Sequence, residues 1–159
     1  MNSVTIRKAT LEDVEGVAQL LYELLNVDDL TEAREAFLRE MQKGDKYIIA
    51  EKDSKIIGLV SWLMHGRPKH GLAELYHIII SKEVRGLGIG TKLFKELVND
   101  LKSTYAHAGS KIRKLFLLTR ATNRHAQQFY KKVGLRYETI LKNHFYEGKD
   151  EWVMSRFFD

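Results

Sequence analysis

The chain has 159 residues, of which 44% are hydrophobic, and it contains no cysteine. This length favours a single domain over residues 1–159 with enough chain for a real core. The lack of cysteine excludes disulfides, thiolate zinc sites and a cysteine nucleophile. No run of about eighteen apolar residues is present, so we expect neither a membrane span nor a secreted protein, and no membrane partner. The composition agrees with a cytoplasmic protein.

The formal net charge is +5. A basic balance is one sign of a nucleic-acid binder. Here, however, charges of both signs alternate along most of the chain instead of forming a block. We therefore expect a solvated, slightly basic surface and no nucleic-acid partner, and we rank a nucleic-acid binder last among the alternatives.

The first half of the chain carries alternating and helical apolar patterns in turn. In chain order they predict a strand, two helices and two strands, over residues 3–8, 10–26, 33–44, 46–51 and 55–64. Asp53 and Ser54 between the last two strands are typical of a tight turn, which indicates an antiparallel hairpin. Asp28, Asp29 and Glu32 lie between the two helices, where they either attract a cationic molecule or form an exposed polar loop.

The second half alternates strands with helices before ending in two strands. The patterns predict a strand over 75–80, a helix with Leu93, Leu97 and Leu101 on one face, a strand over 112–119, a helix over 123–134, and strands over 135–141 and 151–158. Residues 105–110 read as a loop and residues 142–150 as an irregular connection. His65, His70 and His77 match no metal-ligand spacing, so we predict no metal.

The most informative stretch joins the strand ending at Ile80 to the helix that follows it. Its loop reads Arg85-Gly86-Leu87-Gly88-Ile89-Gly90. Glycines let backbone N–H groups approach a phosphate closely, and the start of a helix adds free N–H groups and a positive dipole end. The glycine spacing fits neither the dinucleotide fingerprint nor the P-loop. The sequence thus predicts an anion site of another kind.

Arg85, Gly88 and Gly90 fill the pattern R-x-x-G-x-G, and this resembles the pyrophosphate-binding motif of the GNAT superfamily of acyl-CoA N-acyltransferases. A second signature, N-x-x-A-x-x-F-Y-x-x-x-G-L, runs from Asn123 to Leu135. The C-terminal half, with residues 140–146 and 152–154, is most similar to the N-terminal acetyltransferases of ribosomal proteins. The resemblance covers nearly the whole chain.

The resemblance implies an α/β GNAT fold, with a mixed, mostly antiparallel seven-stranded sheet splayed at strands four and five and flanked by four helices. It also implies an acetyl-CoA-dependent N-acetyltransferase that transfers the acetyl group directly to a primary amine in a ternary complex, with acetyl-CoA as co-substrate and no metal. The implied acetyl-CoA contacts are Ile78, Ile79, Ile80, Arg85, Gly86, Leu87, Gly88, Ile89, Gly90, Thr91, Asn123, Ala126 and Tyr130.

Transfer to an amine needs a base and an acid. An ammonium group with a pKa near 10.4 must lose a proton before it attacks. Glu74 lies eleven residues before Arg85 and is similar to the general-base glutamate of the histone-acetyltransferase-like branch; the alternative is an ion-paired glutamate at a strand start. The family implies that Tyr130 donates a proton to the departing thiolate, unless it is an aromatic of the core. We interpret His77 as a packed histidine.

One departure concerns the acceptor. Ribosomal N-terminal acetyltransferases carry a catalytic glutamate five residues before the helix asparagine, where this chain has Leu118. The acceptor therefore stays open between a small-molecule amine and a protein lysine or N-terminus. A non-catalytic acyl-CoA-binding regulatory module is the alternative function. Exposed strands at the sheet ends are compatible with a homodimer.

Overall fold

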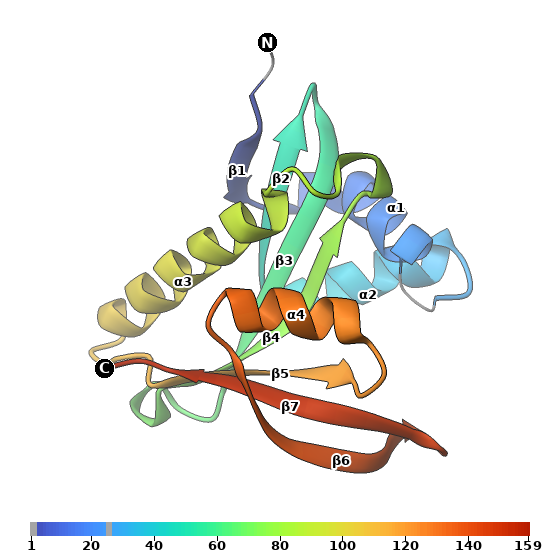
Figure 1. Ribbon diagram of the computed structural model, residues 1–159. Helices are drawn as coiled ribbons and strands as arrows, with labels where there is room; N and C mark the ends of the chain where they lie inside the picture. The colour runs from blue at the N-terminus through green and yellow to red at the C-terminus, as the bar shows by residue number, and fades with distance from the viewer. Residues whose placement is uncertain (1–2, 25–26) are drawn as a thin grey trace. The chain divides into compact units, whose positions relative to one another are not determined.

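The computed structural model describes residues 3–24 and 27–159. Figure 1 shows how the elements in these residues follow one another. The strands are β1 (Thr5–Lys8), β2 (Lys46–Lys52), β3 (Lys55–His65), β4 (Leu72–Ile80), β5 (Lys114–Arg120), β6 (Arg136–Tyr146) and β7 (Lys149–Phe157). The α-helices are α1 (Val14–Leu24), α2 (Leu30–Lys43), α3 (Ile89–His107) and α4 (Arg124–Lys132). Residues 25 and 26, the predicted end of the first helix, lie outside the described residues.

The described strands form one sheet in the order β1-β2-β3-β4-β5-β7-β6. The pairs β1–β2, β2–β3, β5–β7 and β6–β7 are antiparallel, whereas β4 and β5 are parallel. The parallel ladder covers only Leu72–Glu74 on β4 and Lys114–Phe116 on β5. The predicted mixed, mostly antiparallel sheet with a splay at its fourth and fifth strands is confirmed.

The chain folds into two compact units. One comprises the described residues up to Leu63 together with His77–Asp100, and the other comprises Met64–Tyr76 and Leu101–Asp159. The single domain expected over residues 1–159 stays a prediction.

The core of the first unit lies between its two N-terminal helices and its strands. Val17 and Leu21 of α1, Phe37 of α2, and Tyr47 and Leu59 of the sheet are all buried there. The helical residues among them belong to the apolar stripes that the sequence places on one face of each helix. Figure 1 shows α1 and α2 next to each other, and an ion pair of 2.9 Å between Arg34 and Glu15 joins them.

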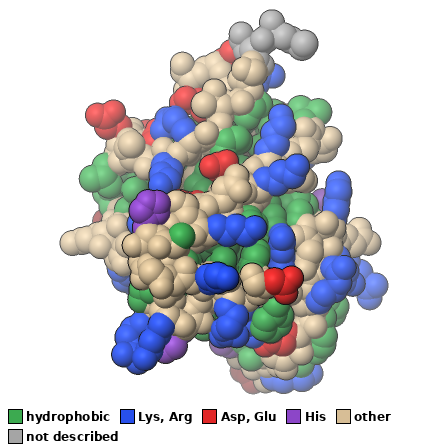
Figure 2. Space-filling model, turned by 90° about the vertical axis from the view of Figure 1, so that its left-hand side faces the viewer, with side chains coloured by type: hydrophobic (Ala, Val, Ile, Leu, Met, Phe, Trp, Pro, Cys, Tyr) green, Lys and Arg blue, Asp and Glu red, His purple; other side chains and the backbone are tan. Residues whose placement is uncertain are grey.

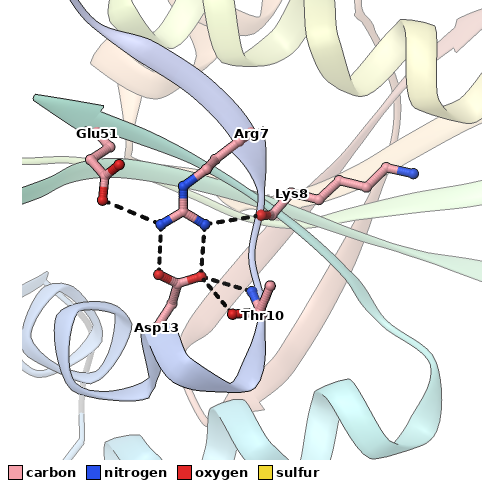
Figure 3. A network of polar contacts seen from close by, with 5 residues as sticks. All are labelled: Arg7, Lys8, Thr10, Asp13 and Glu51. Carbon is pink, nitrogen blue, oxygen red and sulfur yellow. Dashed lines mark hydrogen bonds and ion pairs between the residues drawn. The ribbon is translucent and has the colours of Figure 1, made fainter. Parts of the chain in front are cut away.

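A polar network joins β1 to the turn that follows it and to β2, as Figure 3 shows. Both terminal nitrogens of Arg7 donate to the Asp13 carboxylate, at 3.0 and 2.8 Å. A further bond of 3.2 Å runs from Arg7 to Glu51 of β2. Asp13 also accepts the backbone N–H of Thr10 at 2.7 Å. The predicted helix start is thus observed as a 3₁₀ turn over Leu11–Asp13, which leads into α1 and is tied to the sheet by Arg7.

The β2–β3 hairpin has the predicted tight turn. Asp53 and Ser54 have φ values of 52° and 62°. Two successive left-handed residues are typical of a type I′ turn, whose twist matches that of an antiparallel pair. The hairpin expected from this dipeptide is therefore confirmed.

In the second unit, hydrogen bonds attach α4 to the neighbouring strands. The Gln127 amide donates to the carbonyls of Arg120 and Ala121 at 3.1 and 2.9 Å, which fixes the start of α4 against the end of β5. At the other end of the helix, Arg156 of β7 donates to the carbonyl of Val133 at 3.3 Å. Gly134 follows with a φ of 99° and ends the helix, as predicted.

Two sequence predictions about loops were wrong. Residues 142–150 belong to a long hairpin, visible in Figure 1 as the red β6–β7 pair, and only Glu147-Gly148 make its turn. The irregular appearance comes from Asn143, which has a φ of 48° at a register shift. The Asp150 carboxylate accepts the Asn143 N–H at 3.0 Å, and the Asn143 side chain accepts the Gly148 N–H at 2.8 Å. These side-chain bonds replace ladder bonds and hide the alternation.

The other wrong prediction is the loop over residues 105–110, since α3 continues to His107. Tyr105 is fully buried, and its hydroxyl donates to the Leu72 carbonyl at 2.7 Å. This tertiary contact holds the last turn of the helix in a stretch whose small and polar residues favour a loop.

Candidate functional site

The glycine loop connects β4 to α3, as the sequence predicted. Lys82–Val84 form a 3₁₀ turn, and α3 begins at Ile89, so Gly90 and Thr91 lie in its first turn. Gly86 and Gly88 have φ values of 82° and 80°, a region that residues with a Cβ rarely adopt. Apart from the adjacent residues of the chain, no described protein atom lies within 4 Å of the point where a Cβ would stand on either glycine. The loop thus presents bare backbone to its surroundings.

The electrostatics around this loop favour an anion. The first N–H groups of an α-helix have no partner within the helix, and the dipole of α3 is positive at this end. Lys92 donates its backbone N–H to the Gly88 carbonyl at 3.1 Å, which marks where the helical bonds begin. The first turn, from Ile89 to Lys92, contains no acidic residue. Leu87, at the tip of the loop, is 65% exposed.

Arg85 is exposed, and its Nε donates to the Ile80 carbonyl at 3.3 Å. This bond closes the loop back onto the end of β4. The backbone N–H of Ser81 donates to the Ile57 carbonyl of β3 at 2.8 Å, which fixes the same strand end from the other side. Arg85 is therefore held next to the start of the glycine loop while its terminal nitrogens stay at the surface.

The three isoleucines at the end of β4 differ in burial. Ile79 is 5% exposed and belongs to the hydrophobic core of the first unit, whereas Ile78 and Ile80 are half-buried. This alternation is the expected pattern of a strand in a sheet. The side chain of Ile79 has a core role, so any ligand contact of this residue would be made by its backbone.

Glu74 is the third residue of β4, and its carboxylate contacts His65. Oε1 of Glu74 lies 2.8 Å from Nε2 of His65, the last residue of β3. The side chains are 16% and 38% exposed, respectively. The sequence left two interpretations of Glu74 open, a general base and an ion-paired residue. The structure supplies a polar partner, which is compatible with both.

Tyr130 lies on α4 and is 9% exposed. Burial raises the pKa of its phenol to about 12. The hydroxyl therefore stays protonated at every physiological pH and is available as a donor. The backbone carbonyl of Tyr130 accepts the N–H of Leu135 at 2.9 Å, part of the turn that ends the helix.

Asn123 begins α4. Its Oδ1 accepts the backbone N–H of Ala126 at 3.1 Å, the bond expected of an N-cap residue. Asn123 and Ala126 are thus brought together by the cap, with Asn123 exposed and Ala126 half-buried. The helix start predicted at Asn123 is thus observed as a cap, and the acetyl-CoA contact implied for this residue stays a prediction.

Leu118 lies in β5 opposite Val153 of β7 and is half-buried. Residue 118 therefore offers no carboxylate at this point of the strand. Before the second helix, Asp29 caps α2 by accepting the Glu32 N–H at 2.8 Å, and Glu32 accepts the Asp28 N–H at 2.5 Å. The carboxylates of Asp29 and Glu32 are therefore engaged in a helix start, to which Asp28 contributes its backbone N–H, and this agrees with the polar-loop interpretation.

Sequence reasoning missed a buried polar cluster in the first unit. Glu40 of α2 accepts from the Tyr47 hydroxyl at 2.5 Å and lies 3.1 Å from Nε2 of His77. His77 is 14% exposed, so it is the packed histidine that the sequence predicted, but its partner was not foreseen. Sequence reasoning also missed His65 as the partner of Glu74. In both cases the sequence showed a histidine in a strand or at its end, and an acidic residue elsewhere in the chain. This pattern alone does not identify which residues pair.

The described residues offer no group of three His, Cys, Asp or Glu side chains close enough to hold a metal ion. None of the described helices is long and apolar enough to cross a membrane. On the face in Figure 2, Lys and Arg side chains stand among hydrophobic side chains and some acidic ones.

Comparison with known proteins places these features in a family. Residues 14–135 match the family described as Acetyltransferase (GNAT) family. An N-alpha-acetyltransferase of Sulfolobus acidocaldarius is 26% identical, over 94% of this chain and 90% of the relative. A Bacillus subtilis protein named for alanine N-acetylation of ribosomal protein bS18 is 29% identical, over 94% of this chain and 92% of the relative.

A solved structure shares the fold. The PaiA N-acetyltransferase of Thermoplasma acidophilum, in complex with coenzyme A, superposes with a TM-score of 0.72. It is 19% identical in sequence, and the superposition covers 98% of this chain and 99% of that one. At this identity the likeness concerns the fold.

Proposed function

The chain belongs to the acetyltransferase (GNAT) family, and we propose that it transfers an acetyl group from acetyl-CoA to a primary amine by direct attack in a ternary complex. Its relatives are named N-acetyltransferases, including alpha-amino and ribosomal-protein types. The chain contains no cysteine, so a cysteine-bound acyl intermediate has no place in the reaction. We place the reaction in the cytoplasm, in agreement with the absence of cysteine.

The glycine loop is the single observation that carries the proposal. Gly86 and Gly88 present open, left-handed backbone directly before the first turn of α3. This combination of bare N–H groups and a helix N-terminus suits a pyrophosphate. We assign the pyrophosphate of acetyl-CoA to Arg85, Gly86, Leu87, Gly88, Ile89, Gly90 and Thr91. We assign the pantetheine arm to the backbone of Ile78, Ile79 and Ile80 and to Asn123, Ala126 and Tyr130.

The amine must lose a proton before it attacks the thioester. At neutral pH about one lysine-like amine in two thousand is uncharged, given a pKa near 10.4. We assign the removal of this proton to the Glu74 carboxylate, directly or through a water molecule. Its partial burial beside His65 supports this role, because a carboxylate that is shielded from water holds a defined position.

The reaction also releases a thiolate. We assign the proton for the thiolate to Tyr130, whose burial keeps its hydroxyl protonated. The backbone N–H groups of β4 polarise the thioester carbonyl in this scheme. The tetrahedral intermediate then collapses as the C–S bond breaks, and the acetylated amine and CoA leave.

The acceptor class is part of the proposal: a small-molecule amine, a protein lysine or a protein N-terminus. The relatives named for alpha-amino acceptors favour an N-terminus. Leu118, which stands where the ribosomal enzymes carry a catalytic glutamate, argues against a base inherited from β5. An alpha-amino acceptor would therefore depend on Glu74.

The test is the release of CoA thiol from acetyl-CoA in the presence of separate amines. The panel contains polyamines, aminoglycosides, free amino acids, lysine peptides and peptides with free N-termini. Amine-dependent release above the rate of hydrolysis is the expected result, and the active amine identifies the acceptor class. Binding of CoA by calorimetry without release for any amine would overturn the proposal in favour of a regulatory acyl-CoA-binding module.

A further inference from the structure

We propose that His65 is a positioning residue for Glu74, and this inference rests on the proposed function. In this scheme Nε2–H of His65 donates to Oε1 of Glu74 and holds the carboxylate in one orientation. The other oxygen, Oε2, is left to accept the proton of the acceptor amine. His65 therefore acts on the reaction only through Glu74.

The geometry supports a defined hydrogen bond. The two atoms lie 2.8 Å apart, within the usual range for a bond between a nitrogen donor and a carboxylate. Glu74 is 16% exposed, so water competes little for this oxygen. Within residues 3–24 and 27–159, the Glu74 carboxylate makes this one polar contact, and it makes it with Oε1.

The fold holds His65 and Glu74 next to the same residue of β5. Glu74 pairs in the parallel ladder with Phe116 of β5, so its backbone is fixed by the sheet. The Phe116 ring also lies 5.1 Å from the imidazole of His65, at an interplanar angle of 55°. One β5 residue therefore lies against both members of the pair, and the imidazole has an apolar wall on one side.

The connection between β3 and β4 is fixed as well. It contains a 3₁₀ turn over Pro68–His70, followed by Gly71 with a φ of 59°. The Gly71 carbonyl accepts the N–H groups of Arg113 and Lys114 at 2.7 and 2.9 Å. A Cβ on Gly71 would stand 2.5 Å from the Lys111 carbonyl oxygen, so this approach requires glycine. The two strand ends that carry His65 and Glu74 are thus anchored by the turn between them.

The proton inventory of the step is simple. The acceptor nitrogen gives its proton to Oε2 of Glu74, the carboxylate becomes a carboxylic acid, and the freed lone pair forms the new C–N bond as the carbonyl π electrons move onto the thioester oxygen. When the C–S bond then breaks, the thiolate takes the proton of Tyr130 and the second proton on the nitrogen passes to solvent. His65 keeps its own proton on Nε2 throughout. The Nε2–H of the imidazole supplies one donor to Oε1 and takes no part in the proton transfer.

Four variants test the proposal. His65→Phe keeps an aromatic ring against Phe116 but removes the donor, whereas His65→Gln keeps an N–H donor at a similar reach. Glu74→Gln removes the base, and the double variant combines it with His65→Phe. His107→Phe is the matched control, since His107 is an exposed histidine at the end of α3 whose Nδ1 lies 2.7 Å from the Ser103 carbonyl of its own helix.

We expect His65→Phe to lower kcat by about tenfold, the scale of one hydrogen bond to a charged group, while the affinity for CoA stays unchanged. His65→Gln should recover most of the loss, and His107→Phe should match the wild type. In the Glu74→Gln background, His65→Phe should have no further effect. An equal loss in both backgrounds, or no loss in either, would overturn the positioning role.

A second readout does not depend on turnover. Long-range ¹H–¹⁵N spectra of His65 report which imidazole nitrogen carries the proton, and we expect a protonated Nε2. A bare Nε2 facing the carboxylate would overturn the inference even if the enzyme is active. Conversely, a protein that binds CoA, shows the expected tautomer and acetylates no amine would contradict the proposed function and leave the contact itself intact.

Discussion

The hydroxyl of Tyr47 donates a hydrogen bond of 2.5 Å to one carboxylate oxygen of Glu40, and Nε2 of His77 lies 3.1 Å from the other oxygen. These three residues come from β2, α2 and β4. Burial, followed by the negative charge of Glu40, raises the pKa of the Tyr47 phenol, so Tyr47 is a permanent donor. The cluster therefore couples the packing of α2 to the ionised state of one carboxylate.

The first prediction concerns the acid stability of this cluster. Burial by itself raises the pKa of the Glu40 carboxyl, but the bond and charge of His77 and the bond from Tyr47 outweigh it and lower the pKa below 4.5. A lowered pKa in the folded state stabilises the protein above the unfolded-state value, and this contribution is lost as the pH falls through the folded-state value. Glu40→Gln should unfold at a lower urea concentration than the wild type near neutral pH.

The gap between the two urea midpoints should narrow as the pH falls from the usual glutamate pKa of about 4.3 through the lower folded-state value, because the wild-type carboxyl becomes protonated and resembles the variant. Leu38→Gln, on the same helix at a position that is 42% exposed, is the control for changing a residue of α2. A gap between wild type and Glu40→Gln that stays constant with pH would contradict the role assigned to the charge of Glu40.

The second prediction concerns Asp13. Its carboxylate accepts two bonds from Arg7 and one from the Thr10 N–H, and the Arg7 bond is the main reason that its pKa is lowered. Asp13→Asn should reduce the free energy of unfolding by about 1–2 kcal/mol at neutral pH, the range of a bond to a charged group combined with a helix-start contact.

A matched comparison is available at the same arginine. Glu51 makes one bond of 3.2 Å to Arg7 and is 29% exposed, against 11% for Asp13. Glu51→Gln should therefore cost less than about 1 kcal/mol, as partly exposed pairs do. Equal losses for the two variants, measured by urea denaturation, would show that burial of Asp13 does not matter.

Most of the fold could be predicted because its elements carry strong local signals. The apolar stripes of α1 and α2, the Asp53-Ser54 turn and the glycine loop each express a backbone requirement within a few residues. The elements predicted wrongly depend on distant partners. The last turn of α3 is held by the Tyr105 bond to Leu72, and the β6–β7 hairpin depends on side chains of Asn143 and Asp150 that replace ladder bonds.

The candidate site likewise contains features with a local sequence signal and features that depend on distant partners. The loop from Arg85 to Thr91 is contiguous, so its motif predicted the left-handed glycine backbone that the structure shows, and its binding of an anion stays a prediction. The partner of Glu74 is nine residues away in the chain, and that of His77 is 37 residues away. Pairs of this kind are created by the fold, and a single sequence gives no sign of which histidine will meet which acid.

The third prediction tests the anion site. Gly88→Val places a branched side chain on a residue with a φ of 80°, where the surrounding space is otherwise open. The strain should cost about 1–2 kcal/mol of folding stability. CoA affinity should fall by at least about tenfold, because the side chain covers the N–H groups that we assign to the pyrophosphate.

Gly44→Val is the matched control for strain. Gly44 also has open space around its Cβ position, with a φ of 100°, but it ends α2. The Gly44→Val variant should lose a similar amount of folding stability and should bind CoA as the wild type does. Calorimetry measures both the stability and the affinity. Unchanged CoA affinity in a folded Gly88→Val protein would mean that the pyrophosphate binds elsewhere.

The fourth prediction concerns Tyr130. Tyr130→Phe removes the hydroxyl that we assign to protonation of the leaving thiolate, and kcat should fall by about 100-fold with CoA affinity little changed. Burial raises the pKa of this phenol to about 12, so the wild type should show no alkaline loss of kcat from Tyr130 below about pH 10. The measurement is kcat for both proteins at saturating acetyl-CoA between about pH 7 and about pH 10.

Tyr137→Phe provides the control, since Tyr137 lies on β6 with half of its surface exposed and packs edge-on against Trp152. Its loss of a hydroxyl should leave kcat unchanged. If Tyr130→Phe also kept its kcat while the protein acetylated its amine, the hydroxyl would have no part in the chemistry. Tyr130 would then be an aromatic of the α4 core, and the thiolate would take its proton from solvent.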